Sequence, residues 1–270
     1  MRSFHVVTYV CLTVFVGASV ALGQPVPQSA PAAVVVRDAQ AITILSNAVT
    51  AMGGAVPTDA QVLGNVVIVA GSETSHGTIT ILTRGTDQTS EQVATDADTW
   101  SLIYSKNIAS RTEAGVSSPL SLEGAATTQS ALLPLPYLAG LLESPDCSLQ
   151  YVGAESIKGE SVQHVRVWNT FASDPQLQFL PSFSVKDIWI DAGSGLPRRI
   201  SYLHRDAGGA APKVLTTFDY GPYQKVGATA YPSSIEQSLN GTLWMTVTVQ
   251  SVNLNVGLTD ADFPVAEEGN

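Results

Sequence analysis

The chain has 270 residues, of which 44% are hydrophobic, and a formal net charge of -10 at pH 7. This acidity argues against nucleic acid as a partner, because phosphate binding needs a cationic face and no cluster of lysines and arginines is present. It argues equally against docking by charge on an anionic lipid surface. Solubility is the simplest physical reason for such a charge balance.

The first 23 residues have the pattern of a secretory signal peptide. Arg2 supplies a positive charge, residues 6–22 are mostly apolar, and small residues stand at the −3 and −1 positions before Gln24. This pattern predicts cleavage after Gly23 and an exported chain, periplasmic or secreted, that is not an integral membrane protein once cut. A membrane-anchored N-terminus is the less favoured alternative, since the apolar run is at the short limit of a spanning helix.

The remaining chain is expected to form one domain. Residues 24–33 are rich in Pro, Ala and Gln and indicate a flexible leader. Residues 34–52 repeat apolar side chains at steps of three and four, which predicts a long amphipathic helix. The domain is expected to span 34–265, followed by a tail at 266–270. Cleavage would leave Cys147 as the single cysteine, so stability must come from a core without an internal disulfide.

Beyond this helix the pattern is that of antiparallel strands. Runs of Val, Ile and Thr with a period of two are joined by turn residues. Hairpins are predicted at Lys158-Gly159, at 193–197 and at Asn240-Gly241, the last being the strongest two-residue hairpin signal. In the final run the apolar parity reverses after Ser251, which predicts a β-bulge near Gln250-Ser251. Together these features predict one strongly curved antiparallel sheet.

Two stretches, 115–146 and 171–184, depart from the strand pattern, as binding loops and lids often do. The first contains ALLPLPYLAGLLE at 131–143, which carries no charge before its final glutamate. Thirteen residues are too few to cross a bilayer. Pro136 fits the first turn of a short helix near 136–143. Such a helix could fill the open side of the curved sheet as core, or it could be an exchangeable lid over an apolar cavity.

The order of several short motifs adds a family resemblance. The helix ending in AMGG is followed by WIDAGSGLPRRISY, by FDYGPYQKVGATAYPSSIEQSLNG and by a closing LTDADF. This order is similar to the LolA-like family of exported bacterial proteins, which includes the periplasmic lipoprotein carrier and mycobacterial lipid-binding relatives. The resemblance covers about 34–263 of the chain. It implies a mainly β fold with covering helices (α+β), an incomplete β-barrel with the helices 34–52 and 136–143 packed at its concave face.

On this basis the sequence predicts a non-catalytic binding protein for an apolar ligand, a lipid or the acyl chains of a lipoprotein, with 131–143 as the candidate lid. Two alternatives stay open. One is an envelope interaction or sensor module with a filled core, whose partner is an envelope protein; the other is a hydrolase with an unrecognised site. The candidate cavity-lining residues are Ile79, Ile81, Leu132, Leu133, Tyr137, Leu138, Leu141, Leu142, Trp189, Leu243, Met245 and Val247.

The residue patterns of catalysis and metal binding are not matched. Ser194 stands between two glycines, but Ala192 breaks the nucleophile-elbow motif. The histidines beyond the signal peptide, His76, His164 and His204, lack the spacing of a zinc site. No dinucleotide or phosphate-binding glycine motif is present. No catalytic residue, metal or cofactor is therefore expected.

Overall fold

The computed structural model describes residues 34–128, 131–204 and 213–266. The chain divides into two units, Met1–Pro31 and Ala32–Asn270, and the described residues belong to the second. The signal peptide, its cleavage after Gly23 and the leader at 24–33 lie outside the described residues, so they stay predictions.

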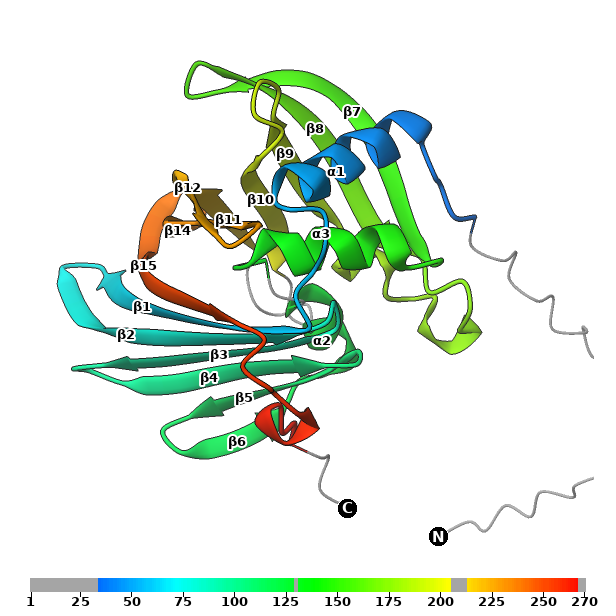
Figure 1. The fold of residues 1–270 in the computed structure, drawn as a ribbon. Helices are drawn as coiled ribbons and strands as arrows, with labels where there is room; N and C mark the ends of the chain where they lie inside the picture. The colour runs from blue at the N-terminus through cyan, green and yellow to red at the C-terminus, as the bar shows by residue number, and fades with distance from the viewer. Residues whose placement is uncertain (1–33, 129–130, 205–212, 267–270) are drawn as a thin grey trace, which may run out of the picture. The chain divides into compact units, whose positions relative to one another are not determined.

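Most of the described chain is one large antiparallel sheet with helices on its concave side (Figure 1). The helices are α1 (Ala39–Ala51), α2 (Leu122–Thr128) and α3 (Pro134–Glu143), with short 3₁₀ turns η1 (Pro175–Leu177), η2 (Pro181–Phe183) and η3 (Asp260–Asp262). The strands are β1 (Asp59–Ala70), β2 (Glu73–Arg84), β3 (Gln88–Thr95), β4 (Thr99–Ser105), β5 (Ile108–Glu113), β6 (Val116–Pro119), β7 (Cys147–Ile157), β8 (Glu160–Asn169), β9 (Lys186–Asp191), β10 (Pro197–His204), β11 (Val214–Tyr220), β12 (Tyr223–Val226), β13 (Thr229–Pro232), β14 (Ser234–Leu239) and β15 (Thr242–Leu254).

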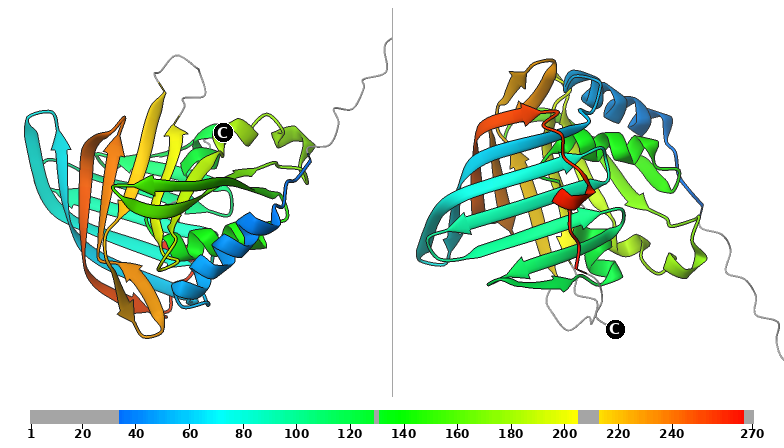
Figure 2. Two further views of the ribbon diagram at one scale, coloured as in Figure 1. Left: turned by 90° about the horizontal axis from the view of Figure 1, so that it is seen from above. Right: turned by 60° about the horizontal axis from the view of Figure 1, so that its bottom comes forward.

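The sheet is strongly curved but not closed. Its 13 strands follow the order β6-β5-β4-β3-β2-β1-β15-β14-β11-β10-β9-β8-β7, and β12 pairs only with β13. Strands β6 and β7 are therefore the two end strands of the sheet and do not pair with each other, and Figure 2 shows the open, curled sheet from two further directions. This confirms the predicted fold class, an incomplete β-barrel with covering helices.

The curvature has a local cause in β15. Leu63 of β1 lies opposite Ser251, whereas its neighbour Gly64 lies opposite Val249. Gln250 is the extra residue of a bulge, which confirms the predicted parity reversal. Glycine is required at the bulge, because a Cβ on Gly64 would lie 2.8 Å from the backbone oxygen of Thr248.

Two of the predicted hairpins have the turn conformation that their residues favour. Lys158 and Gly159 adopt φ of 51° and 87°, and Asn240 and Gly241 adopt 50° and 80°. Positive φ at both central residues is the signature of the type I′ turn, whose twist matches that of the flanking strands.

Helix α1 begins later than the predicted residue 34. The carboxylate of Asp38 accepts hydrogen bonds from the amides of Gln40 and Ala41, so it caps the helix. Before the cap the chain is extended: the amide of Leu149 in β7 donates to the carbonyl of Val36 at 2.7 Å. The three consecutive valines at 34–36 favour this extended pairing over helix.

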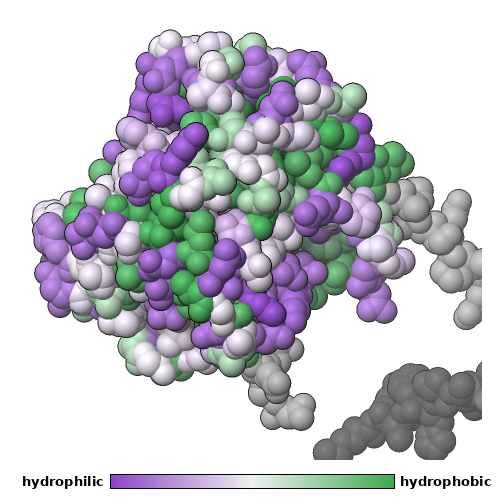
Figure 3. Space-filling view, in the orientation of Figure 1, coloured by the Kyte–Doolittle hydropathy of each residue, from purple (hydrophilic) through white to green (hydrophobic). Residues whose placement is uncertain are grey.

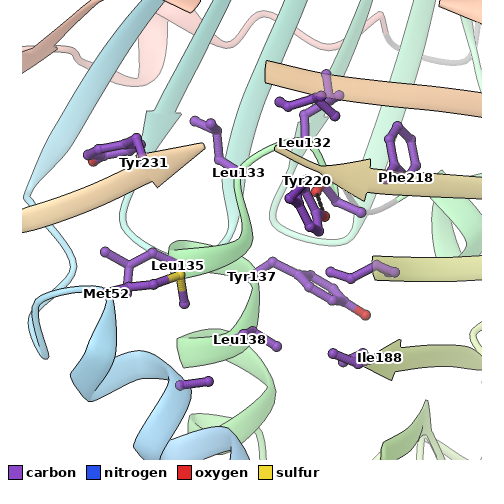
Figure 4. Packing of buried hydrophobic residues seen from close by; sticks show 14 of the residues in the cluster. Met52, Leu132, Leu133, Leu135, Tyr137, Leu138, Ile188, Phe218, Tyr220 and Tyr231 are labelled. Carbon is purple, nitrogen blue, oxygen red and sulfur yellow. Dashed lines mark hydrogen bonds between the residues drawn. The ribbon is translucent and has the colours of Figure 1, made fainter. Parts of the chain in front are cut away.

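The core lies between the concave face of the sheet and the helices α1 and α3. Figure 4 shows Met52 from the end of α1, Leu135 and Leu138 from α3, and Ile188 from β9 converging there. Leu138 and Ile188 are fully buried. None of the helices among the described residues has both the length and the hydrophobicity needed for a bilayer span.

The C-terminal LTDADF motif covers the outer face of the sheet. Phe263 is buried against Leu82 of β2 and Ile103 of β4. Asp260 accepts hydrogen bonds from Arg84 at 2.7 Å and from Gln88 at 3.1 Å. The motif therefore attaches the end of the chain to β2–β4, and Figure 2 shows this segment (red) crossing these strands.

Candidate functional site

Helix α3 is the observed form of the apolar segment 131–143. It begins at Pro134, two residues before the predicted start, because both Pro134 and Pro136 fall in the first turn, where no amide donor is needed. All of its residues except Gly140, Leu142 and Glu143 are buried. The helix therefore fills the concave face in this structure.

The two ends of α3 are held differently. At the C-terminal end, the Arg37 guanidinium donates to the carbonyl of Leu142 at 2.9 Å and to that of Ser144 at 3.3 Å. At the N-terminal end, Leu133 occupies the cap position and has no side-chain hydrogen bond to the helix. The hydroxyl of Tyr220 donates to the carbonyl of Ala131, just before the helix.

A pocket of about 520 Å³ lies beside α3. This volume falls within the range of about 300–1,000 Å³ typical of small-molecule sites. The pocket is formed by α2, α3, the β2–β3, β4–β5 and α3–β7 turns, the end of β8 and the β8–β9 loop. Its apolar and aromatic wall includes Leu122, Tyr104, Tyr137, Leu141, Val167, Trp168, Phe171, Leu177 and Leu180. Hydrophobic and hydrophilic residues interleave on the face of the protein seen in Figure 3.

Most of the predicted cavity residues come together in one core cluster. Those buried in the cluster or packed against it are Ile79, Ile81, Leu132, Leu133, Tyr137, Leu138, Leu141, Leu142, Met245 and Val247. Of these, Tyr137 and Leu141 also line the pocket, while the others are packed between the sheet and α3. The role of this set in ligand binding stays a prediction.

The structure places two of the predicted cavity residues elsewhere, and this is a correction. Trp189 lies on the face opposite its buried neighbours Ile188 and Ile190, where its ring stacks on His164 at 4.4 Å between centroids. The strand pattern carried a signal for this position, because Trp189 has the same parity as Asp187 and Asp191. Trp189 therefore belongs to the outer face of β9.

Leu243 is 40% exposed and lies outside the core cluster. The cause is a second register shift: Ser238 of β14 lies opposite Leu243, whereas Gln237 lies opposite Met245. Trp244 is the extra residue, and it packs against the cluster in place of Leu243.

The polar groups in the pocket wall are neutral where they are buried. Burial raises the pKa of the Cys147 thiol to about 12, so this cysteine is not a thiolate nucleophile. Burial, together with the nearby Asp87 carboxylate, raises the pKa of Tyr104 to about 12. Burial also raises the pKa of Tyr137 well above its ordinary value. The pocket's interior is therefore uncharged at neutral pH, and its charges lie nearer the rim.

Lys186 is a buried amine whose position was not among the sequence-based expectations. Its side chain is 2% exposed, and its Nζ lies 5.2 Å from the ring centroid of Tyr137 and 5.4 Å from that of Tyr202. Burial lowers the pKa of Lys186 to about 7. The strand pattern carried a signal for this position, because Lys186 has the same parity as Ile188 and Ile190.

The described histidines offer no base for hydrolysis at this pocket. Both ring nitrogens of His164 lie 2.7 Å from carboxylate oxygens, Nδ1 from Glu155 and Nε2 from Asp187. Neither nitrogen is left to activate a nucleophile. Ser194 donates its hydroxyl to Asp191 within a hairpin turn. In the part of the chain that the structure describes, no group of three His, Cys, Asp or Glu side chains could hold a metal ion.

Comparison with known proteins places the fold. No family model and no curated protein matches the chain. Among solved structures, a LolA superfamily protein from Nitrosomonas europaea is 14% identical, with a TM-score of 0.55 over 83% of this chain and 97% of that one. A putative outer membrane lipoprotein-sorting protein domain from Vibrio parahaemolyticus is 10% identical, with a TM-score of 0.55 over 83% and 96%.

A DUF1329 family protein from Desulfovibrio piger is 11% identical, with a TM-score of 0.54 over 83% of this chain and 97% of that one. At these identities the likeness shows a shared fold. The chain therefore has the LolA-like fold that its motifs resemble.

Proposed function

We propose that this chain is an exported, non-catalytic binding protein that holds an apolar ligand against the concave face of its half-barrel, with residues 131–143 as the lid. The ligand is a lipid or the acyl chains of a lipoprotein. In the ligand-free state α3 covers the concave face. In the ligand-filled state the acyl chain of the ligand takes the place of part of α3. The protein acts in the periplasm or outside the cell.

The observation that carries this proposal is the position of α3. It covers an apolar surface that includes Ile79, Ile81 and Val247, and it is also a wall of the pocket. A ligand can therefore reach the covered surface from the pocket by displacing a single ten-residue helix. Burial of apolar area favours helix and ligand alike, at about 25 cal/mol per Å². The balance between the two states then depends only on the difference between the affinities of the helix and of the ligand for the sheet.

Helix α3 can be locked to test this. A Cβ at Gly140 would lie 3.2 Å from the Cβ of Thr86. This is slightly below the separation of about 3.5–4.5 Å found in disulfides, so a small shift suffices for a bond. The test protein is T86C/G140C with Cys147→Ala, which prevents mispairing. Uptake of an uncharged fluorescent fatty alcohol is compared in the oxidised and reduced forms of this one protein, so reduction is the matched control.

The expected result is strong uptake by the reduced form and little by the oxidised form. Equal uptake by both forms would show that α3 need not move, and the lid proposal would be abandoned. Uptake by neither form, nor by the unmodified chain, would contradict apolar ligand binding itself.

One observation favours the alternative, an envelope interaction module. The concave face is already filled by α3, whose Leu135 and Leu138 are only 1% and 0% exposed. If the lock leaves every function of the chain intact, the partner would be an envelope protein that docks on the rim.

A further inference from the structure

We propose that the pocket beside α3 takes the cationic head of an amphiphile, an ammonium or similar organic cation on an alkyl chain, and rejects anionic heads. The inference that the alkyl chain lies against the concave face rests on the proposed function. The preference for a cationic head rests on the residues of the pocket alone.

The charged groups of the pocket are all acidic. Its wall contains four carboxylates, those of Asp87, Glu143, Asp146 and Asp174. Within the described residues, no lysine, arginine or histidine lines the pocket, and none of the four carboxylates forms an ion pair. An anionic head placed here would meet like charges without a counter-ion, whereas a cationic head would be attracted.

The hydroxyl of Tyr137 gives a second, independent reason. Tyr137 is 3% exposed and lines the pocket. Its hydroxyl is paired with no hydrogen-bond donor or acceptor in the described chain, whereas the Tyr104 hydroxyl donates to Asn107 at 2.9 Å. Figure 4 shows the Tyr137 ring extending from α3 on the side away from Met52. The hydroxyl can therefore accept a hydrogen bond from a ligand N–H.

The aromatic composition fits the same class of ligand. Tyr104, Tyr137, Trp168 and Phe171 all line the pocket. The faces of aromatic rings attract cations, most strongly when both are shielded from water, and this is how proteins recognise quaternary ammonium groups.

The cations near the pocket are already engaged and do not reverse this preference. Arg37 donates to backbone carbonyls at the end of α3, including those of Leu142 and Ser144. Lys106 pairs with Asp260 at 3.4 Å. Lys186 lies over the rings of Tyr137 and Tyr202 and is not part of the pocket wall.

The head-group preference can be measured with three probes that share one alkyl chain. Dodecyltrimethylammonium, dodecyl maltoside and dodecyl sulfate are titrated into the full chain by calorimetry, each below its critical micelle concentration and at the same ionic strength. The ammonium is expected to bind about tenfold tighter than the maltoside, and the sulfate most weakly. Equal affinities would overturn the cation preference and leave the proposed function standing. No binding of any probe would overturn both.

Two variants locate the effect in the pocket. Glu143→Gln removes a pocket carboxylate, and Glu236→Gln removes an exposed carboxylate of β14 outside the pocket. The first should weaken ammonium binding several-fold and leave maltoside binding unchanged, while the second should change neither. Equal losses in both variants would mean that the net charge of the chain attracts the probe, and the pocket assignment would be withdrawn.

The hydroxyl is tested with Tyr137→Phe. This variant should weaken binding of dodecylammonium, which has N–H donors, more than binding of dodecyltrimethylammonium, which has none. Equal effects on the two probes would show that the Tyr137 hydroxyl does not bind the head group.

Discussion

Replacing Leu138 by alanine tests whether α3 is packed as core in the ligand-free protein. Leu138 is fully buried in the core cluster formed by the sheet, α1 and α3. The substitution removes three carbon groups, a transfer loss of about 2.4 kcal/mol at about 0.8 kcal/mol each. The cavity left behind adds to this, so the expected loss of unfolding free energy is about 2.7–5 kcal/mol. For a domain of this size the melting temperature should fall by roughly 5–20 °C.

The assay is equilibrium urea unfolding followed by tryptophan fluorescence, with circular dichroism as the second probe. The matched control is Leu243→Ala, since Leu243 is 40% exposed and outside the core cluster. That change should alter stability by no more than about 0.5 kcal/mol. A loss below about 1 kcal/mol for Leu138→Ala, with an unchanged m-value, would refute the reasoning, because it would mean that α3 is not tightly packed.

Three further predictions concern the rest of the fold. Phe263→Ala should cost about 3–5 kcal/mol in urea unfolding, since the ring is 2% exposed under the closing motif; a loss under 1 kcal/mol would contradict its role there. Hydrogen bonds from Ser194 hold the pKa of Asp191 below its usual value, so its stabilisation is complete above about pH 4 and is lost as the pH falls further. Asp191→Asn should therefore flatten the acid slope of stability, and an unchanged slope would argue against this. Because burial lowers the pKa of Lys186 to about 7, the unfolded chain holds more protons above that pH, and stability should rise between about pH 7 and 9. Lys186→Met should abolish the rise, and a rise that persists would assign it to another group.

The sequence predicted the architecture where a local signal has one physical meaning. The parity reversal at Gln250-Ser251 indicates a bulge, and the turn residues Asn240-Gly241 indicate a tight hairpin. The apolar segment 131–143 could be recognised as a covering helix, since no polar face competes with burial.

The pocket could not be predicted in the same way. Its carboxylates come from turns and a loop that are far apart in the chain, such as Asp87 and Asp174, and polar turn residues are common whether or not they meet. Trp189 was misplaced because its hydrophobic ring was given more weight than its parity, which it shares with Asp187 and Asp191. Leu243 was misplaced because alternation alone does not reveal a second bulge, and only the folded sheet shows that this side chain turns outward.

The most direct measurement of the central claim is native mass spectrometry of gently purified residues 24–270, before and after organic extraction. The binding proposal predicts a discrete extra mass that disappears on extraction and is recovered as a lipid or other alkyl amphiphile. A single ligand-free mass that stays unchanged after incubation with mixed lipids would contradict it, and α3 would then be a permanent part of the core.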